Sequence, residues 1–164
     1  MLRLFACVFV LLGAVLPFVA GAQEEGKVYR IKNKFSDKVL APNDSGNLLV
    51  QRSVVLKDES NRWKLEKSRQ GDFYHIVNVV SGKMLTSPSS AALAQIRLQD
   101  GNDSFGQLWV IEPLNQHFTI RSRSSKLYLD VHDFSLDDGA KIIQQTLNKK
   151  GGRGNQMWQL VPVN

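Results

Sequence analysis

Three tryptophans recur at nearly even spacing along the 164-residue chain, and this recurrence constrains the fold more than any other feature. They are Trp63, Trp109 and Trp158, 46 and 49 positions apart, and the sequence holds no others. Each is followed two residues later by a large aliphatic residue. Self-similarity at a fixed period of roughly 20–50 residues is typical of chains built from copies of one unit. The tryptophans therefore predict three copies of one structural unit.

Each copy also opens in the same way, with an aromatic residue followed two residues later by isoleucine. The opening segments are Tyr29–Asn33, Tyr74–Asn78 and Phe118–Ser122. A period of two is typical of a β-strand with one buried face. Each copy is thus expected to begin with a half-buried strand and to end with the strand that contains its tryptophan.

Two more strand candidates lie inside each copy. A polar turn and a second short strand are expected over Ser36–Leu40, Ser81–Leu85 and Ser125–Leu129, and the third strands are expected at Leu48–Arg52, Ala94–Gln99 and Ala140–Gln145. The links are rich in Gly, Ser, Asn and Asp, and no window longer than about ten residues keeps a helical apolar face. A unit this small cannot bury its apolar face alone, so three should close on one core. The sequence predicts an all-β domain of about twelve short strands, with repeats at about 27–67, 72–113 and 116–163.

The N-terminus carries the pattern of a cleaved signal peptide. Arg3 supplies the positive region, and Leu4–Val19 is apolar but is interrupted by Pro17. The small residues Ala20-Gly21-Ala22 then form a cleavage site. The apolar run is short for a transmembrane anchor. We therefore expect residues 1–22 to be removed, residues 23–164 to form one domain, and the mature protein to be secreted (extracellular or periplasmic) and not to span a membrane.

Composition narrows the classes of protein and of partner that remain possible. The only cysteine, Cys7, lies in the signal peptide, so the mature chain would have no disulfide and would depend on its core. The formal charge of +6 suits contact with anionic surfaces or glycans. The basic residues are scattered and form no long block, which argues against nucleic acid as a partner. Asn43 and Asn102 each begin an Asn-x-Ser glycosylation pattern.

Catalytic and metal motifs are not found in the sequence. It has no Gly-x-Ser-x-Gly, no candidate catalytic cysteine and no defensible pair of acid and base carboxylates. The set of Asp130, His132 and Asp133 could recruit a hard cation, but solvated turn residues explain these acids better. The expectation is a protein that is not an enzyme and has no metal or cofactor.

The tryptophans close a motif that carries a family resemblance. The motif is Gln-x-Trp, present as Gln107-Leu108-Trp109 and Gln156-Met157-Trp158, with Asn61-Arg62-Trp63 as a degenerate first copy. From Lys27 to Val163 the chain resembles the ricin-B-type lectin family, whose fold is the β-trefoil. The resemblance implies that the tryptophans are scaffold. It also implies a shallow sugar pocket on any repeat that keeps an Asp after the second strand, an aromatic on the third strand and an Asn before Gln-x-Trp.

Only the third repeat keeps the polar residues of this pattern. It has Asp130, Asn155 and Gln156, and His132 would add a hydrogen bond from the same face of the strand. Gln145 falls at the aromatic position, and Phe134 or His132 could substitute for the missing ring. The other two repeats have lost the Asp and the Asn: Ala41 and Ser60 stand there in the first, Thr86 and Gly106 in the second.

The resemblance therefore implies a carbohydrate-binding protein with at most one site. Its carbohydrate-binding residues would be Asp130, His132, Gln145, Asn155 and Gln156, and its partner a carbohydrate or glycoconjugate. Two alternatives stay open. Asp130 and Asn155 could form a purely structural hydrogen bond, or the chain could be a β-trefoil scaffold or inhibitor that binds a protein. In the second case the contact loops would be Lys34–Ser36, Pro88–Ala92 and Lys149–Arg153.

Overall fold

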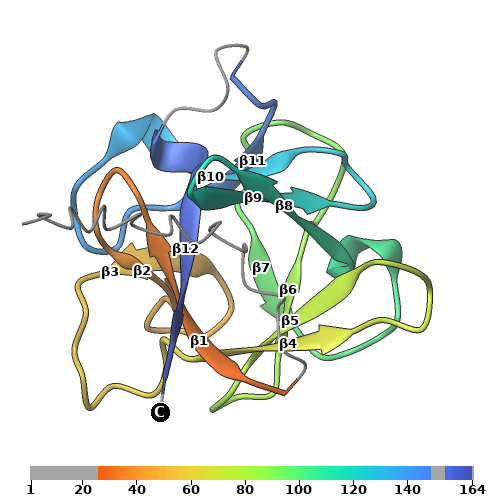
Figure 1. Ribbon diagram of the computed structural model, residues 1–164, viewed down its shortest axis with the longest axis horizontal. Helices are drawn as coiled ribbons and strands as arrows, with labels where there is room; N and C mark the ends of the chain where they lie inside the picture. Colours follow the sequence, from red (N-terminus) through yellow and green to blue (C-terminus); the bar gives the residue numbers. More distant parts are fainter. Residues whose placement is uncertain (1–25, 149–153, 164) are drawn as a thin grey trace, which may run out of the picture.

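The computed structural model describes residues 26–148 and 154–163, and within them the fold is entirely β-structure with three short 3-10 turns (Figure 1). The strands are β1 (Val28–Asn33), β2 (Val39–Pro42), β3 (Leu49–Arg52), β4 (Trp63–Lys67), β5 (Tyr74–Asn78), β6 (Met84–Thr86), β7 (Arg97–Gln99), β8 (Trp109–Leu114), β9 (His117–Ser122), β10 (Tyr128–Val131), β11 (Ile142–Gln145) and β12 (Trp158–Pro162). The 3-10 turns are η1 (Phe105–Gln107), η2 (His132–Phe134) and η3 (Gly154–Gln156). The predicted signal peptide and the Lys149–Arg153 loop lie outside the described residues.

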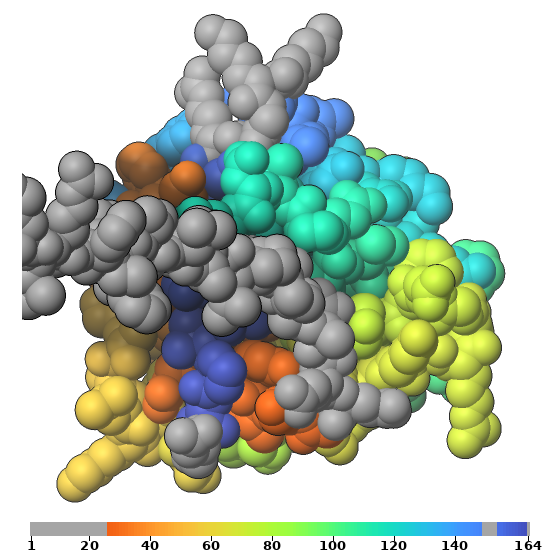
Figure 2. Space-filling model, in the orientation of Figure 1, coloured from red at the N-terminus to blue at the C-terminus, as the bar shows by residue number. Residues whose placement is uncertain are grey.

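Six of the strands close into a barrel. Antiparallel pairing runs from β1 to β12, β9, β8, β5 and β4 and returns to β1. The remaining strands form three hairpins, β2–β3, β6–β7 and β10–β11, attached to β1, β5 and β9. This is the β-trefoil, and the predicted fold class is confirmed. In the view of Figure 2 much of the first repeat lies at lower left and of the second at right, while the third repeat covers the upper right and also reaches the lower centre with its C-terminal end.

The three tryptophans play one role three times. Trp63, Trp109 and Trp158 are all 0% exposed. Each indole Nε1 donates to a carbonyl oxygen on the second strand of its own repeat, over 3.0, 2.9 and 3.3 Å. Burying such a ring contributes about 2–3 kcal/mol, and the donated bond avoids an unpaired N–H in the core. The tryptophans are scaffold, as the resemblance implied.

Two buried glutamines tie the repeats to one another, a role that no sequence pattern predicted. Gln51 Nε2 donates to the carbonyl oxygens of Ser135 and Asp137, over 2.9 and 3.0 Å. Gln144 Nε2 donates to those of Ser89 and Ala91, over 2.8 and 2.7 Å. Each glutamine therefore anchors a loop of a different repeat.

The third strand of the second repeat is shorter than predicted. We expected Ala94–Gln99, whereas β7 is Arg97–Gln99. The reason is that residues 95 and 96 pair with the third repeat: Gln95 bridges Ile143, and Ile96 N–H donates to the Ile142 carbonyl over 2.9 Å. No helix among the described residues is long and apolar enough to cross a membrane.

Candidate functional site: a pocket in the third repeat

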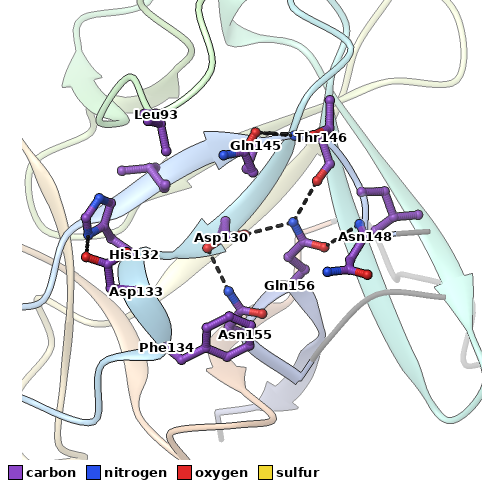
Figure 3. A pocket seen from close by; sticks show the side chains of 12 residues that line it. Leu93, Asp130, His132, Asp133, Phe134, Gln145, Thr146, Asn148, Asn155 and Gln156 are labelled. Carbon is purple, nitrogen blue, oxygen red and sulfur yellow. Dashed lines mark hydrogen bonds and ion pairs between the residues drawn. The ribbon is translucent and has the colours of Figure 1, made fainter. Parts of the chain in front are cut away.

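A pocket of about 660 Å³ lies beside β10, where η2, the end of β11 and η3 meet (Figure 3). All of the residues predicted to bind carbohydrate line it: Asp130, His132, Gln145, Asn155 and Gln156. Its volume is within the roughly 300–1,000 Å³ typical of small-molecule sites. The pocket therefore unites predicted residues that lie up to 26 positions apart in the sequence.

Asp130 forms the floor of the pocket. It is the third residue of β10 and only 6% exposed. Its Oδ1 accepts a hydrogen bond from Asn155 Nδ2 and its Oδ2 accepts one from Gln156 Nε2, each over 2.8 Å (Figure 3). A carboxylate has about four lone-pair sites, so each oxygen keeps acceptor capacity after these two bonds. The two hydrogen bonds fix the position of the carboxylate and leave acceptor capacity on both of its oxygens.

Burial has the largest influence on the pKa of the Asp130 carboxyl group. It raises the pKa of Asp130 from 3.8 to about 6, and the amide bonds from Gln156 and Asn155 act in the opposite direction. His132 also lowers the pKa, whereas the Asp133 carboxylate raises it slightly. Loss of hydration disfavours the charged form, and hydrogen bonds to the carboxylate favour it. Above pH 6 the pocket holds a negative charge.

The two amides beside Asp130 differ in how fully they are bonded. Gln156 Nε2 also donates to the Thr146 carbonyl over 2.9 Å, and its Oε1 accepts from Asn148 N–H over 3.1 Å. Asn155 Nδ2 donates again to the Val131 carbonyl over 3.2 Å. Asn155 Oδ1, in contrast, is buried and has no hydrogen-bond partner within residues 26–148 and 154–163. Gln156 therefore belongs to the scaffold, while Asn155 keeps an acceptor.

His132 and Gln145 line the pocket differently from expectation. β10 ends at Val131, so His132 lies in η2 and not on the strand face that we predicted. Its Nδ1 is 3.1 Å from the Asp133 carboxylate. The Gln145 side chain folds back, because its Oε1 accepts from the backbone N–H of Thr146 over 2.9 Å. Neither side chain bonds directly to Asp130 in the described structure (Figure 3).

Two apolar side chains from loops lie on opposite sides of the pocket (Figure 3). Phe134 in η2 is half-buried, and its ring meets Phe35 of the first repeat edge-to-face, with centroids 5.5 Å apart. Leu93 is 58% exposed and comes from the second-repeat loop that Gln144 anchors. Phe134 was one of the rings considered as a substitute at this site. Leu93 carried no signal in the sequence, because another repeat supplies it.

The corresponding positions of the other repeats bear no acid. In the first, Ala41 is fully buried, and Asn61 Oδ1 accepts from Arg30 Nε over 2.9 Å. In the second, Thr86 Oγ1 accepts from Gln107 Nε2 over 3.2 Å, and Gly106 supplies no side chain. Among the described residues no group of three or more His, Cys, Asp or Glu side chains could hold a metal ion.

The threefold barrel and the amide-held carboxylate define the class of lectin-like β-trefoil modules. The model of the ricin-type beta-trefoil lectin domain-like family matches three overlapping stretches, residues 16–99, 59–145 and 105–164. The chain belongs to this family, and the resemblance found in the sequence is confirmed. A search of curated protein sequences gave no match.

Solved structures agree with this assignment. The designed threefold-symmetric protein ThreeFoil is 26% identical, with a TM-score of 0.76 over 83% of this chain and 99% of that protein. An exo-β-1,3-galactanase from Clostridium thermocellum is 28% identical, with a TM-score of 0.74 over 84% of this chain but 30% of the enzyme. The Macrolepiota procera ricin B-like lectin, solved with lactose, is 16% identical, with a TM-score of 0.71 over 86% of this chain and 99% of the lectin. The chain thus matches the whole of two small β-trefoil proteins and less than a third of the galactanase.

Proposed function

We propose that the protein binds carbohydrate through the third-repeat pocket and carries out no chemistry on it. The observation that carries the proposal is the Asp130 carboxylate, which two amides hold at the floor of an open pocket. Its remaining lone pairs can accept from two neighbouring sugar hydroxyls, and such charge-assisted bonds are stronger than neutral ones. Membership of a lectin-like family supports the same function.

The other pocket residues divide the remaining tasks. Asn155 Oδ1 accepts a third hydroxyl, which would satisfy a buried oxygen that lacks a partner in the described chain. The Phe134 ring covers the apolar C–H face of the sugar in place of the aromatic residue that Gln145 replaces. His132 adds a polar contact at the rim, and Gln156 holds Asp130 in position.

A single pocket of this kind should bind weakly. A dissociation constant in the millimolar range corresponds to about −4 kcal/mol, which a few charge-assisted bonds supply after ordering costs. Tight attachment to a glycan surface would require several copies acting together.

The isosteric variant Asp130→Asn tests the proposal. It keeps the size of the side chain but removes the charge and one of the two oxygens that accept from Asn155 and Gln156, so we expect sugars found on a glycan array to lose affinity at least tenfold by saturation-transfer NMR. Asp72→Asn is the matched control, because Asp72 is an exposed carboxylate on the second repeat, paired with Lys67 over 3.4 Å. Unchanged binding by Asp130→Asn, or a silent array for the wild-type protein, would overturn the proposal.

A protein partner is the second candidate, and one observation favours it. Val54, Val55 and Leu56 are consecutive and 43, 57 and 75% exposed, on the loop between β3 and β4. Exposed apolar clusters often mark interaction surfaces. A stoichiometric partner whose capture requires these side chains and resists competition by free sugar would support this function. Capture that free sugar abolishes would contradict it.

Export is part of the proposal. The support is the sequence pattern alone, with its positive start, apolar run and Ala20-Gly21-Ala22 cleavage motif. N-terminal sequencing of protein recovered from the medium or periplasm should begin at Gln23. Recovery of the chain only inside the cell, with residues 1–22 retained, would contradict it.

A further inference from the structure

A second hollow, of about 410 Å³, occupies the place in the second repeat that the Asp130 pocket occupies in the third. Thr86 and Gly106 line it, and these are the positions that correspond to Asp130 and Asn155. Around them lie mainly hydroxyl side chains, including Ser104 and Ser124. No sugar-binding acid is left here, yet the hollow has remained open and polar.

The strand register shows that this hollow carries the opposite charge to the third-repeat pocket. In β6–β7, Thr86 pairs directly with Arg97, whereas in β10–β11 Asp130 pairs with Ile143. Directly paired residues of antiparallel strands point to the same face, so Arg97 stands over Thr86 as Ile143 stands beside Asp130. An acid with an apolar neighbour has been replaced by a hydroxyl with a guanidinium.

Arg97 is free to bind a ligand. Its side chain is exposed, and within the described residues its guanidinium makes no ion pair or hydrogen bond. It lines the hollow, none of whose lining residues is acidic. Arg97 and Lys83 also line a neighbouring depression, in which Asp100 is the acidic lining residue. The Lys83 ammonium donates to Asn47 over 3.0 Å and adds a second positive charge on that side.

Gly106 keeps the hollow open. A Cβ at this position would lie 2.8 Å from the backbone oxygen of Ser87, so no side chain can stand where Asn155 stands in the third repeat. The hydroxyl of Thr86 is already engaged, because it donates to the Met84 carbonyl over 3.1 Å and accepts from Gln107. The groups left to meet a ligand include the guanidinium and the rim hydroxyl of Ser104, and both can donate to an anion.

We propose that this hollow binds the anionic group of an acidic saccharide, a carboxylate or a sulfate, with Arg97 as the principal contact. The planar guanidinium presents paired N–H donors that match the oxygens of either group. The ligand class differs from that of the third repeat, where a carboxylate selects hydroxyl donors. The two sites share no lining residue, so this proposal stands independently of the function proposed above.

The test is a two-dimensional amide NMR titration of the processed protein with three probes: glucose 6-sulfate, glucuronic acid and glucose. We expect one or both acidic probes to shift the amides of Arg97, Ser104 and Gly106, with glucose leaving them in place. The probe that acts distinguishes sulfate from carboxylate recognition. Arg97→Gln should weaken this binding about tenfold or more, since a charged hydrogen-bond donor is lost.

Lys57→Gln is the matched control, because it removes one exposed positive charge from the first-repeat loop between β3 and β4. It should leave binding of the acidic probe within about twofold of wild type, whereas a diffuse attraction to the basic protein would fall in both variants. Asp130→Asn should leave it unchanged as well, which separates this site from the third-repeat pocket. Equal binding by Arg97→Gln and wild type, or amide shifts confined to other residues, would overturn the proposal.

Discussion

The pockets of the second and third repeats share one scaffold and differ in chemistry. Gln107 and Gln156 are equivalent, and each accepts a backbone N–H through Oε1, over 2.9 and 3.1 Å. Each also donates to a backbone carbonyl and to the third residue of the second strand of its repeat, which is Thr86 in one and Asp130 in the other. The glutamine is therefore satisfied whether its neighbour is a hydroxyl or a carboxylate. The binding chemistry of a repeat can change while its fold persists.

The largest expected loss of stability should be equal in the two repeats, because it follows from changes in the scaffold that they share. Trp109→Ala and Trp158→Ala each remove a fully buried ring, and each should lower the free energy of unfolding by about 3–5 kcal/mol. Urea denaturation measures both. A difference of more than about 2 kcal/mol between them would show that the repeats do not share the core equally.

The next largest loss of stability should follow from a substitution in the second repeat alone. Gly106→Ala drives a Cβ to 2.8 Å from the Ser87 backbone oxygen, which should cost about 1–3 kcal/mol of stability. Gly101→Ala is the control, since its Cβ would meet only the flexible end of Met84 at 3.0 Å. If Gly106→Ala proves as stable as this control, the geometry that separates the two pockets is wrong.

Thr86→Asp, in contrast, should be tolerated, because Gln107 can donate to a carboxylate as Gln156 does.

The close contact at Gly106 is one of the features that could not be predicted from the sequence, whereas others could. The repeat, the buried tryptophans and the grouping of Asp130 with Asn155 and Gln156 follow from short motifs that each repeat carries in its own segment. Contacts between repeats do not follow from such motifs. Leu93 reaches the third-repeat pocket because Gln144 anchors a loop of the second repeat, and no local pattern encodes that approach. His132 was misplaced for a local reason, since the strand ends one residue earlier and a 3-10 turn begins.

The two pockets should also differ in their response to pH. If sugar binding needs ionised Asp130, whose pKa is about 6, affinity in the third repeat should be about tenfold lower at pH 5 than at pH 7. The stability of the free protein should move the other way. The folded-state pKa lies above the ordinary 3.8, so the folded chain holds a proton that the unfolded chain loses, and this group's contribution falls as the pH rises from about 4 through 6.

Calorimetric titration at both pH values, with denaturation at the same points, measures these opposite trends. His132→Gln is the control, because His132 and Asp133 are the other titratable side chains lining the pocket. The pH dependence of binding should persist in this variant. Its disappearance would assign the dependence to the histidine and not to Asp130.

The smallest expected effect concerns how the first repeat, which has lost its own acid, supports the third. Phe35 meets Phe134 edge-to-face at 5.5 Å, and Asn33 Nδ2 holds the Asn155 carbonyl over 3.1 Å while its Oδ1 accepts from Phe35 N–H over 2.9 Å. An aromatic pair of this kind contributes about 0.5–1.5 kcal/mol. Phe35→Leu should therefore weaken sugar binding by about two- to tenfold, because the Phe134 ring loses its lateral support.

A purely structural role for Phe35 predicts something different. It would lower the melting temperature of Phe35→Leu and leave the affinity of the remaining folded protein unchanged. Phe35→Tyr keeps the ring and should restore affinity, whereas the second-repeat hollow should respond to neither variant, because Phe35 does not line it. Measured together, the two affinities therefore determine whether the first repeat acts on one pocket specifically or on the whole barrel.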